Sequence, residues 1–67
     1  MSIHWCNNWQ HANEVQDMFA MQGQSTYVVE VGFRLAVVTE LEQVDRLKAE
    51  SGEVVGEIHP QDFDEGF

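Results

Sequence analysis

A chain of 67 residues with 12 acidic and 3 basic side chains, and a formal net charge of −9, has room for one small acidic domain. This charge disfavours binding to nucleic acid or anionic membranes, which would repel it, and favours basic protein surfaces. With 43% hydrophobic and 10% aromatic residues, the composition is that of a folded domain and excludes a disordered acidic linker.

The first expected element is an amphipathic helix over residues 8–22. Asn7 is placed to cap its start with Gln10 three residues later, and Gly23 suits a left-handed end. The apolar face is formed by Trp9, Ala12, Val15 and Phe19. A short extended piece over residues 2–5 is left open as a further element.

Residues 26–39 (TYVVEVGFRLAVVT) are β-branched and apolar around a Gly-Phe pair, which is typical of a β-hairpin. A two-residue turn with Gly32 first would be type II′. We prefer a three-residue loop over residues 32–34, because it leaves Glu30 on the polar face and makes the buried face wholly apolar. That buried face would hold Tyr27, Val29, Val31, Leu35 and Val37. In either register Phe33 lies near the tip.

A second helix is predicted from the sequence TELEQVDRLKAESG. Thr39 is expected to cap its start, with Glu42 as the reciprocal cap and Gly52 as the stop. The following segment, EVVGEIH, alternates as an edge strand whose outer face would be acidic and carry Glu53 and Glu57. Pro60 ends this strand.

These elements predict an α+β fold in the order α-β-β-α-β. We expect a three-stranded antiparallel sheet in the order 2-1-3, with both helices packed on one face and the opposite face open. Residues 1–67 would form this single domain. The acidic tail, residues 60–67, is expected to dock onto it, with Phe63 folding back on the open face.

The residue types that bind metals are few and wrongly spaced. His4, Cys6 and His11, joined by His59 from the last strand, do not supply the paired short spacings of a structural zinc site. The sequence also has no glycine-rich phosphate loop and no recognisable catalytic order of serine or cysteine with histidine. We therefore expect a protein that is not an enzyme and that takes no metal and no cofactor.

The location of the protein is predicted from what the sequence lacks. Its single cysteine cannot form an internal disulfide, and the first residues have neither the basic start nor the apolar run of a secretory signal. The longest apolar runs fall far short of the roughly 20 residues that a membrane-spanning helix needs. We expect a soluble, cytoplasmic protein.

The acidic side chains are the strongest functional feature. Glu40, Glu42 and Glu50 suit helix capping and i,i+4 pairing with Arg46, so they have structural roles. The remaining acids form a candidate surface for a basic partner, or serve only solubility and edge protection. The candidate residues, with one aromatic anchor, are Glu30, Asp45, Glu53, Glu57, Asp62, Asp64, Glu65 and Phe33.

The chain resembles the phage-encoded anti-CRISPR proteins, especially small acidic inhibitors of type I complexes such as type I-C. The resemblance lies in its size, its acidity and the segment TELEQVDRLKAESGEVVGEIHPQDFDEGF. These inhibitors share no common fold or residue set, so the resemblance assigns no site residue. It implies a protein of the bacterial host cytoplasm that binds a Cascade-type complex, at the surface where DNA enters, and prevents target recognition.

The sequence thus favours an acidic monomer that imitates DNA and blocks a basic groove. The alternative is an antitoxin-like or adaptor module that binds its partner, or a second copy, through an apolar sheet face. That face would contain Val28, Ala36 and Val38. A charge-led contact would weaken strongly with salt, whereas an apolar contact would change little.

Overall fold

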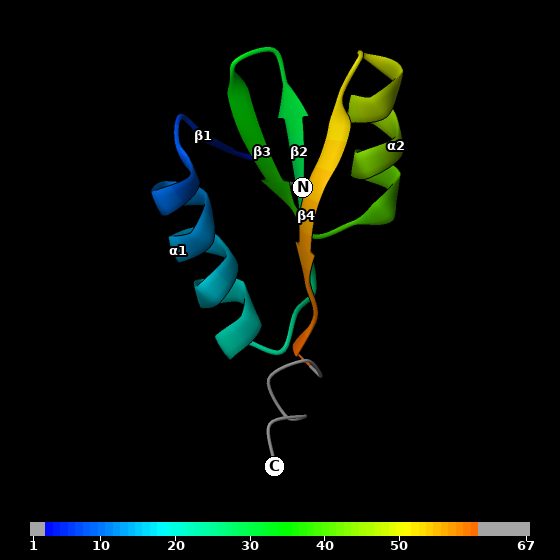
Figure 1. Ribbon diagram of the computed structural model, residues 1–67. Coiled ribbons are helices and arrows are strands. Elements are labelled where there is room, and N and C mark those ends of the chain that lie inside the picture. The colour runs from blue at the N-terminus through cyan, green and yellow to red at the C-terminus, as the bar shows by residue number, and fades with distance from the viewer. Residues whose placement is uncertain (1–2, 61–67) are drawn as a thin grey trace.

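The structure, a computed structural model, describes residues 3–60. Its elements in chain order are β1 (His4–Cys6), α1 (Trp9–Met21), β2 (Thr26–Val31), β3 (Arg34–Val38), α2 (Leu41–Ala49) and β4 (Glu53–Ile58). Figure 1 shows the sheet between the two helices, with β4 running down the front. Neither helix in this part of the chain is long and apolar enough to cross a membrane.

The strands form one antiparallel sheet in the order β1-β3-β2-β4. The α+β class and the antiparallel sheet are confirmed, and the three longer strands lie in the predicted order. The prediction of three strands was one short, because the extended piece before the first helix pairs with β3 and places Cys6 opposite Leu35. This pairing makes β1 one edge of the sheet and β4 the other.

The two helices cover opposite faces of the sheet, so the prediction that both lie on one face was wrong. α1 packs on a cluster that includes Val28 and Val37, whereas α2 packs on a cluster that includes Val29, Ala36 and Val38. Because successive residues of a strand point to opposite faces, the apolar runs of β2 and β3 place hydrophobic side chains on both faces of the sheet. Each side therefore needs a helix to bury it.

The β2–β3 hairpin turns on two residues, Gly32 and Phe33. Val31 lies opposite Arg34, so the three-residue loop preferred from the sequence was wrong. Gly32 has a φ of +64°, which matches the first position of a type II′ turn. The three-residue loop was preferred because it gave the hairpin a single apolar face. This reason does not apply, since a helix covers each face of the sheet.

Strand β4 contains a β-bulge. Gly56 lies opposite Val28, but Val54 lies opposite Val29, the very next residue of β2. Val55 is the extra residue between them. A bulge leaves one residue out of the pairing and interrupts the alternation of faces along the strand. The simple alternation predicted for this strand therefore fails at Val55.

The ends of α1 follow the expected chemistry with a shift of one residue. The N-cap is Asn8 rather than the predicted Asn7, and its side chain accepts a hydrogen bond from the backbone N–H of His11 at 2.8 Å. At the other end Gly23 has a φ of +79°, as predicted for a left-handed stop. The helix is therefore closed at both ends by local bonds.

The ends of α2 differ more from the prediction. Its N-cap is Glu40, with no side-chain capping bond, so the expected cap by Thr39 was wrong. The left-handed residue that ends the helix is Ser51, with a φ of 75°, and not Gly52. Gly52 is needed for a different reason, because a Cβ on it would lie 2.5 Å from the carbonyl oxygen of Leu47.

Candidate functional site

Two glutamates face each other at the hairpin end of the sheet. Glu30 of β2 and Glu53 of β4 are direct cross-strand partners, and both side chains are exposed. Like charges opposite each other in an antiparallel pair are destabilising, since their Cβ atoms are only about 5 Å apart. Phe33 lies at the same end, in the β2–β3 turn, and its side chain is fully exposed. Three of the predicted partner-binding residues therefore lie at one end of the sheet.

The basic side chains do not neutralise this glutamate pair. Arg46 forms an ion pair with Glu42 of its own helix at 3.8 Å. The guanidinium of Arg34 lies 4.4 Å from the ring centre of Trp5, a cation–π contact. Within residues 3–60 the other close contact between an acid and a basic group joins Glu57 to His59, so Glu30 and Glu53 have no cationic partner there.

The bulge separates Glu53 from Glu57. Glu53 lies opposite Glu30, on the face that α1 covers, whereas Glu57 lies opposite Tyr27, on the face that α2 covers. The prediction that these two glutamates share one outer face was therefore wrong. Asp45 is exposed on α2, and this helix covers the face of the sheet opposite to the one that carries Glu30 and Glu53. Among residues 3–60, the predicted acids therefore do not form one continuous row.

The acids of the tail lie outside the described residues. This holds for Asp62, Asp64 and Glu65, and for the expected docking of the tail beyond Pro60. The candidate site is therefore built from Glu30, Glu53 and the elements around them.

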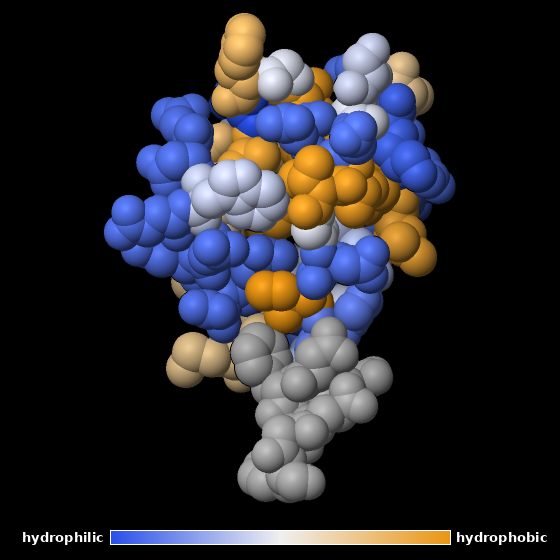
Figure 2. Space-filling view, in the orientation of Figure 1, coloured by the Kyte–Doolittle hydropathy of each residue, from blue (hydrophilic) through white to orange (hydrophobic). Residues whose placement is uncertain are grey.

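An apolar strip runs beside β4 that the sequence reasoning did not single out. α1 packs against β1, β2 and β3, whereas α2 packs against β2, β3 and β4, so α1 leaves the β4 end of its face largely open. Trp9, 45% exposed, lies against Gly56, where a Cβ would stand 3.6 Å from the indole ring. Val55 is half-buried beside it. Figure 2 shows apolar side chains in the middle of this view, bordered by hydrophilic ones.

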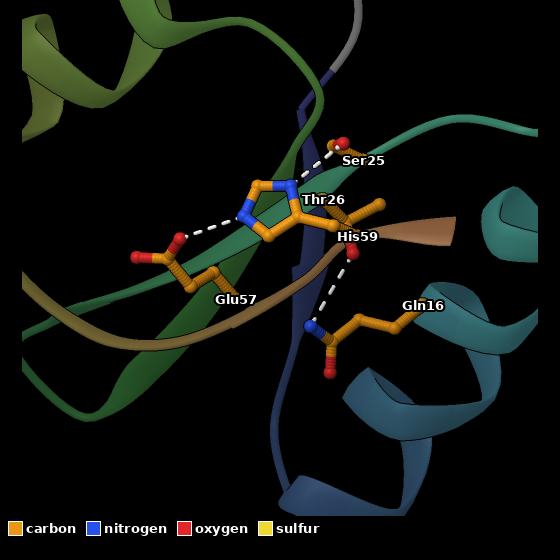
Figure 3. A network of polar contacts seen from close by, with 5 residues as sticks. All are labelled: Gln16, Ser25, Thr26, Glu57 and His59. Carbon is orange, nitrogen blue, oxygen red and sulfur yellow. Dashed lines mark hydrogen bonds and ion pairs between the residues drawn. The ribbon is translucent and has the colours of Figure 1, made fainter. Parts of the chain in front are cut away.

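His59 ties the end of β4 to the loop before β2. Its Nδ1 lies 2.8 Å from Oγ of Ser25, and its Nε2 lies 2.8 Å from Oε1 of Glu57 (Figure 3). The ring also meets Tyr27 edge-on, with 5.8 Å between the ring centres. Ser25 and His59 are 34 positions apart in the chain, so no local sequence pattern could reveal their contact.

Serine, histidine and a carboxylate are also the residue types of a hydrolase triad. In that triad Nε2 of the histidine faces the hydroxyl and Nδ1 faces the carboxylate. Here the two nitrogens are exchanged, and Glu57, the acid, is exposed at the surface. We interpret the network as a clamp that fixes the last residues of β4 against the α1–β2 loop.

The residues weighed as metal ligands are engaged separately. Cys6 is buried in the α1 cluster, and this burial raises the pKa of its thiol above the ordinary value. The His4 ring packs against Phe19 at 5.4 Å between ring centres, and His11 is exposed on α1. In the part of the chain that the structure describes, no three His, Cys, Asp or Glu side chains gather as metal ligands would.

The apolar sheet face considered as an alternative binding surface is not available. Val28, Ala36 and Val38 are each 0% exposed, since one helix or the other covers them. The residues named for an antitoxin-like or adaptor contact are therefore part of the core.

No protein-family model, curated protein or solved structure matches the chain. The function is therefore inferred from the geometry and charge described above.

Proposed function

We propose that the protein is a non-enzymatic inhibitor that offers carboxylates to the basic, nucleic-acid-binding surface of a protein complex and so keeps nucleic acid off that surface. The observation that carries the proposal is the exposed cross-strand pair of Glu30 and Glu53, with no cationic partner among the described residues. A cation from a partner placed beside both carboxylates would relieve their repulsion. The pair therefore gains more from a basic surface than an isolated acid does.

The overall charge supports the same function. A net charge of −9 on a chain of 67 residues gives a strong negative field that steers the encounter with a basic groove. Such grooves gain most of their affinity for nucleic acid from neutralising phosphates. A carboxylate surface competes for the same lysines and arginines.

Phe33 is proposed as the apolar anchor of this contact. Charge governs how fast two proteins meet, whereas buried aromatic side chains usually hold the complex together. Phe33 is fully exposed at the same end of the sheet as Glu30 and Glu53. Burying it against the partner would add apolar contact to the charged one.

The resemblance to anti-CRISPR proteins supplies the partner class. We propose that the protein acts in the bacterial cytoplasm as a monomer on a type I effector complex, with type I-C first among these. It would bind the basic surface where target DNA enters and prevent target binding.

The test measures target-DNA binding by a purified type I-C effector complex, by fluorescence anisotropy, with increasing amounts of the protein. We expect the protein to lower DNA binding, and the effect to fall steeply as salt rises from about 50 to 200 mM. The double variant Glu30→Lys/Glu53→Lys should lose this inhibition.

The matched control is Glu14→Lys/Asp17→Lys, which makes the same change in net charge on the exposed side of α1. It should keep most of the inhibition. Equal loss in both variants would show that only net charge matters, and unchanged inhibition in Glu30→Lys/Glu53→Lys would remove the site. Full DNA binding at saturating wild-type protein would overturn the proposed function for this complex.

A further inference from the structure

We infer that the free edge of β4 accepts an extended, lysine- or arginine-bearing segment of a partner protein as an additional antiparallel strand. This inference deepens the proposed function and rests on it for the identity of the partner, because it states how a basic partner chain would be held. Its own test uses no effector complex, so the two can fail separately.

The first observation is the open edge itself. β4 pairs with β2 on one side and ends the sheet on the other, within residues 3–60. Backbone N–H and C=O groups of a strand point alternately to its two sides, so an edge strand presents a row of groups that another strand can bond. β4 has 6 residues, whereas the opposite edge strand, β1, has only 3. Figure 1 shows the β4 ribbon in front of the sheet, between the ribbons of α1 and α2.

The second observation is the charge on both sides of this edge. The bulge turns Glu53 to the α1 face and Glu57 to the α2 face, and both side chains are exposed. Side chains of an added strand would alternate between the same two faces. Lysines or arginines on that strand can therefore meet Glu53 on the α1 face. On the α2 face they can meet Glu57 through the carboxylate oxygen that does not bond His59.

The third observation is the apolar surface between the two charges. Val55 and Gly56 lie in the middle of β4, with the half-exposed ring of Trp9 over Gly56. Figure 2 shows apolar atoms in this region with hydrophilic side chains around it. The strand that fits this edge is therefore cationic toward its ends and carries apolar residues in its middle.

The same features disfavour a second copy of this chain as the occupant. Pairing β4 with β4 of another copy would bring Glu53 and Glu57 of both copies to one seam, and like charges across a strand pair are destabilising. Charged residues and a bulge on an edge strand are known devices against self-association. The edge therefore selects a partner of opposite charge.

The test uses a synthetic peptide of about ten residues with two lysines at each end and valines between them, a length that matches a typical strand. Two consecutive lysines present one lysine to each face of the sheet. We expect saturable binding by fluorescence anisotropy, and slower hydrogen exchange at those β4 amides that exchange readily in the free protein. The control peptide has the same sequence with N-methyl groups on consecutive backbone nitrogens through its middle, which keep its charge and block strand pairing through both of its edges.

The control peptide should bind at least about tenfold more weakly, because several backbone hydrogen bonds to β4 are lost. Equal binding of the two peptides, or no change in β4 exchange, would overturn the edge-pairing inference while leaving a charge-led function standing. Conversely, peptide pairing without any effect on the effector complex would remove the proposed function alone.

A charge exchange tests the flanking glutamates. The variant Glu53→Lys/Glu57→Lys should lose at least about tenfold in affinity for the lysine peptide and bind instead a peptide with glutamates in place of the lysines. Circular dichroism establishes that the variant is folded. Failure of the exchanged pair to bind, in a folded variant, would contradict the inference. So would a wild-type dimer in sedimentation that the lysine peptide does not dissociate.

Discussion

Nε2 of Gln16 in α1 donates a hydrogen bond to Oγ1 of Thr26, the first residue of β2, at 3.3 Å. Both side chains are buried, and Figure 3 shows the bond crossing from helix to sheet below the His59 network. The pair anchors α1 to the sheet through a polar contact inside an otherwise apolar layer.

Replacing Thr26 by valine should lower the free energy of unfolding by about 1–3 kcal/mol, because the buried amide of Gln16 loses its partner. Urea unfolding of the variant measures this. The double variant Gln16→Leu/Thr26→Val should recover much of the loss, since neither polar group then remains. A Thr26→Val protein as stable as the wild type would show that the bond contributes nothing.

Gly52, just before β4, and Gly56, within β4, should respond oppositely to substitution by alanine. Gly52→Ala forces a Cβ to within 2.5 Å of the Leu47 carbonyl oxygen and 2.8 Å of Val29, so we expect a loss of about 1–3 kcal/mol. Gly56→Ala places its Cβ at ordinary contact distance from Trp9, 3.6 Å, and should be neutral or stabilising by up to about 1 kcal/mol. Thermal unfolding of the two variants compares them directly, and equal destabilisation would contradict the packing described at Gly56.

Ser51→Gly should stabilise the protein. Ser51 holds a left-handed φ of 75°, which costs a residue with a Cβ roughly 1–2 kcal/mol and costs glycine little. Part of this gain is offset by the greater freedom of glycine in the unfolded chain, so the expected net gain is about 0.5–1 kcal/mol. Glu50→Gly, one residue earlier at a φ of −99°, is the control and should destabilise. The midpoint of urea unfolding decides between these outcomes.

The buried thiol of Cys6 should make stability fall in alkaline solution. Burial raises the pKa of this thiol in the folded protein above its value in the unfolded chain. Its contribution to stability is therefore fully present below the unfolded pKa, and it is lost as pH rises through the folded pKa.

The free energy of unfolding, measured by urea from about pH 7 to 10, should decline more steeply for the wild type than for Cys6→Ala. Groups other than Cys6 that titrate in this pH range affect both proteins equally, so the difference between the two profiles reports on the Cys6 thiol. Parallel profiles would contradict an elevated thiol pKa.

The sequence predicted the elements better than their layers. The order of β3, β2 and β4 followed from the hairpin and the crossover by α2, and those predictions were confirmed. The prediction that both helices lie on one face was wrong because it assumed a single apolar face for each strand. Val28 and Val29 are neighbours in the sequence, and both are buried. Two adjacent buried valines indicate a strand covered on both sides.

The candidate site was predictable only in part. Glu30 and Phe33 could be placed near the hairpin tip from local patterns alone. Their proximity to Glu53 depends on the register between β2 and β4, and that register depends on a bulge that no local signal marks. The network of His59 with Ser25 joins residues far apart in the chain, so only the folded structure brings it into view.

The irregularity at Val55 also bears on how this chain can vary in length. A shorter version of the protein that lacked this one residue would pair β4 with β2 continuously, and every other β4 side chain would stay on its present face. A deletion inside β2, in contrast, would turn half of that strand over, exchange its valines between the two clusters and move Glu30 to the face that α2 covers. Homologous chains should therefore gain or lose residues at this position of β4 while the length of β2 stays constant.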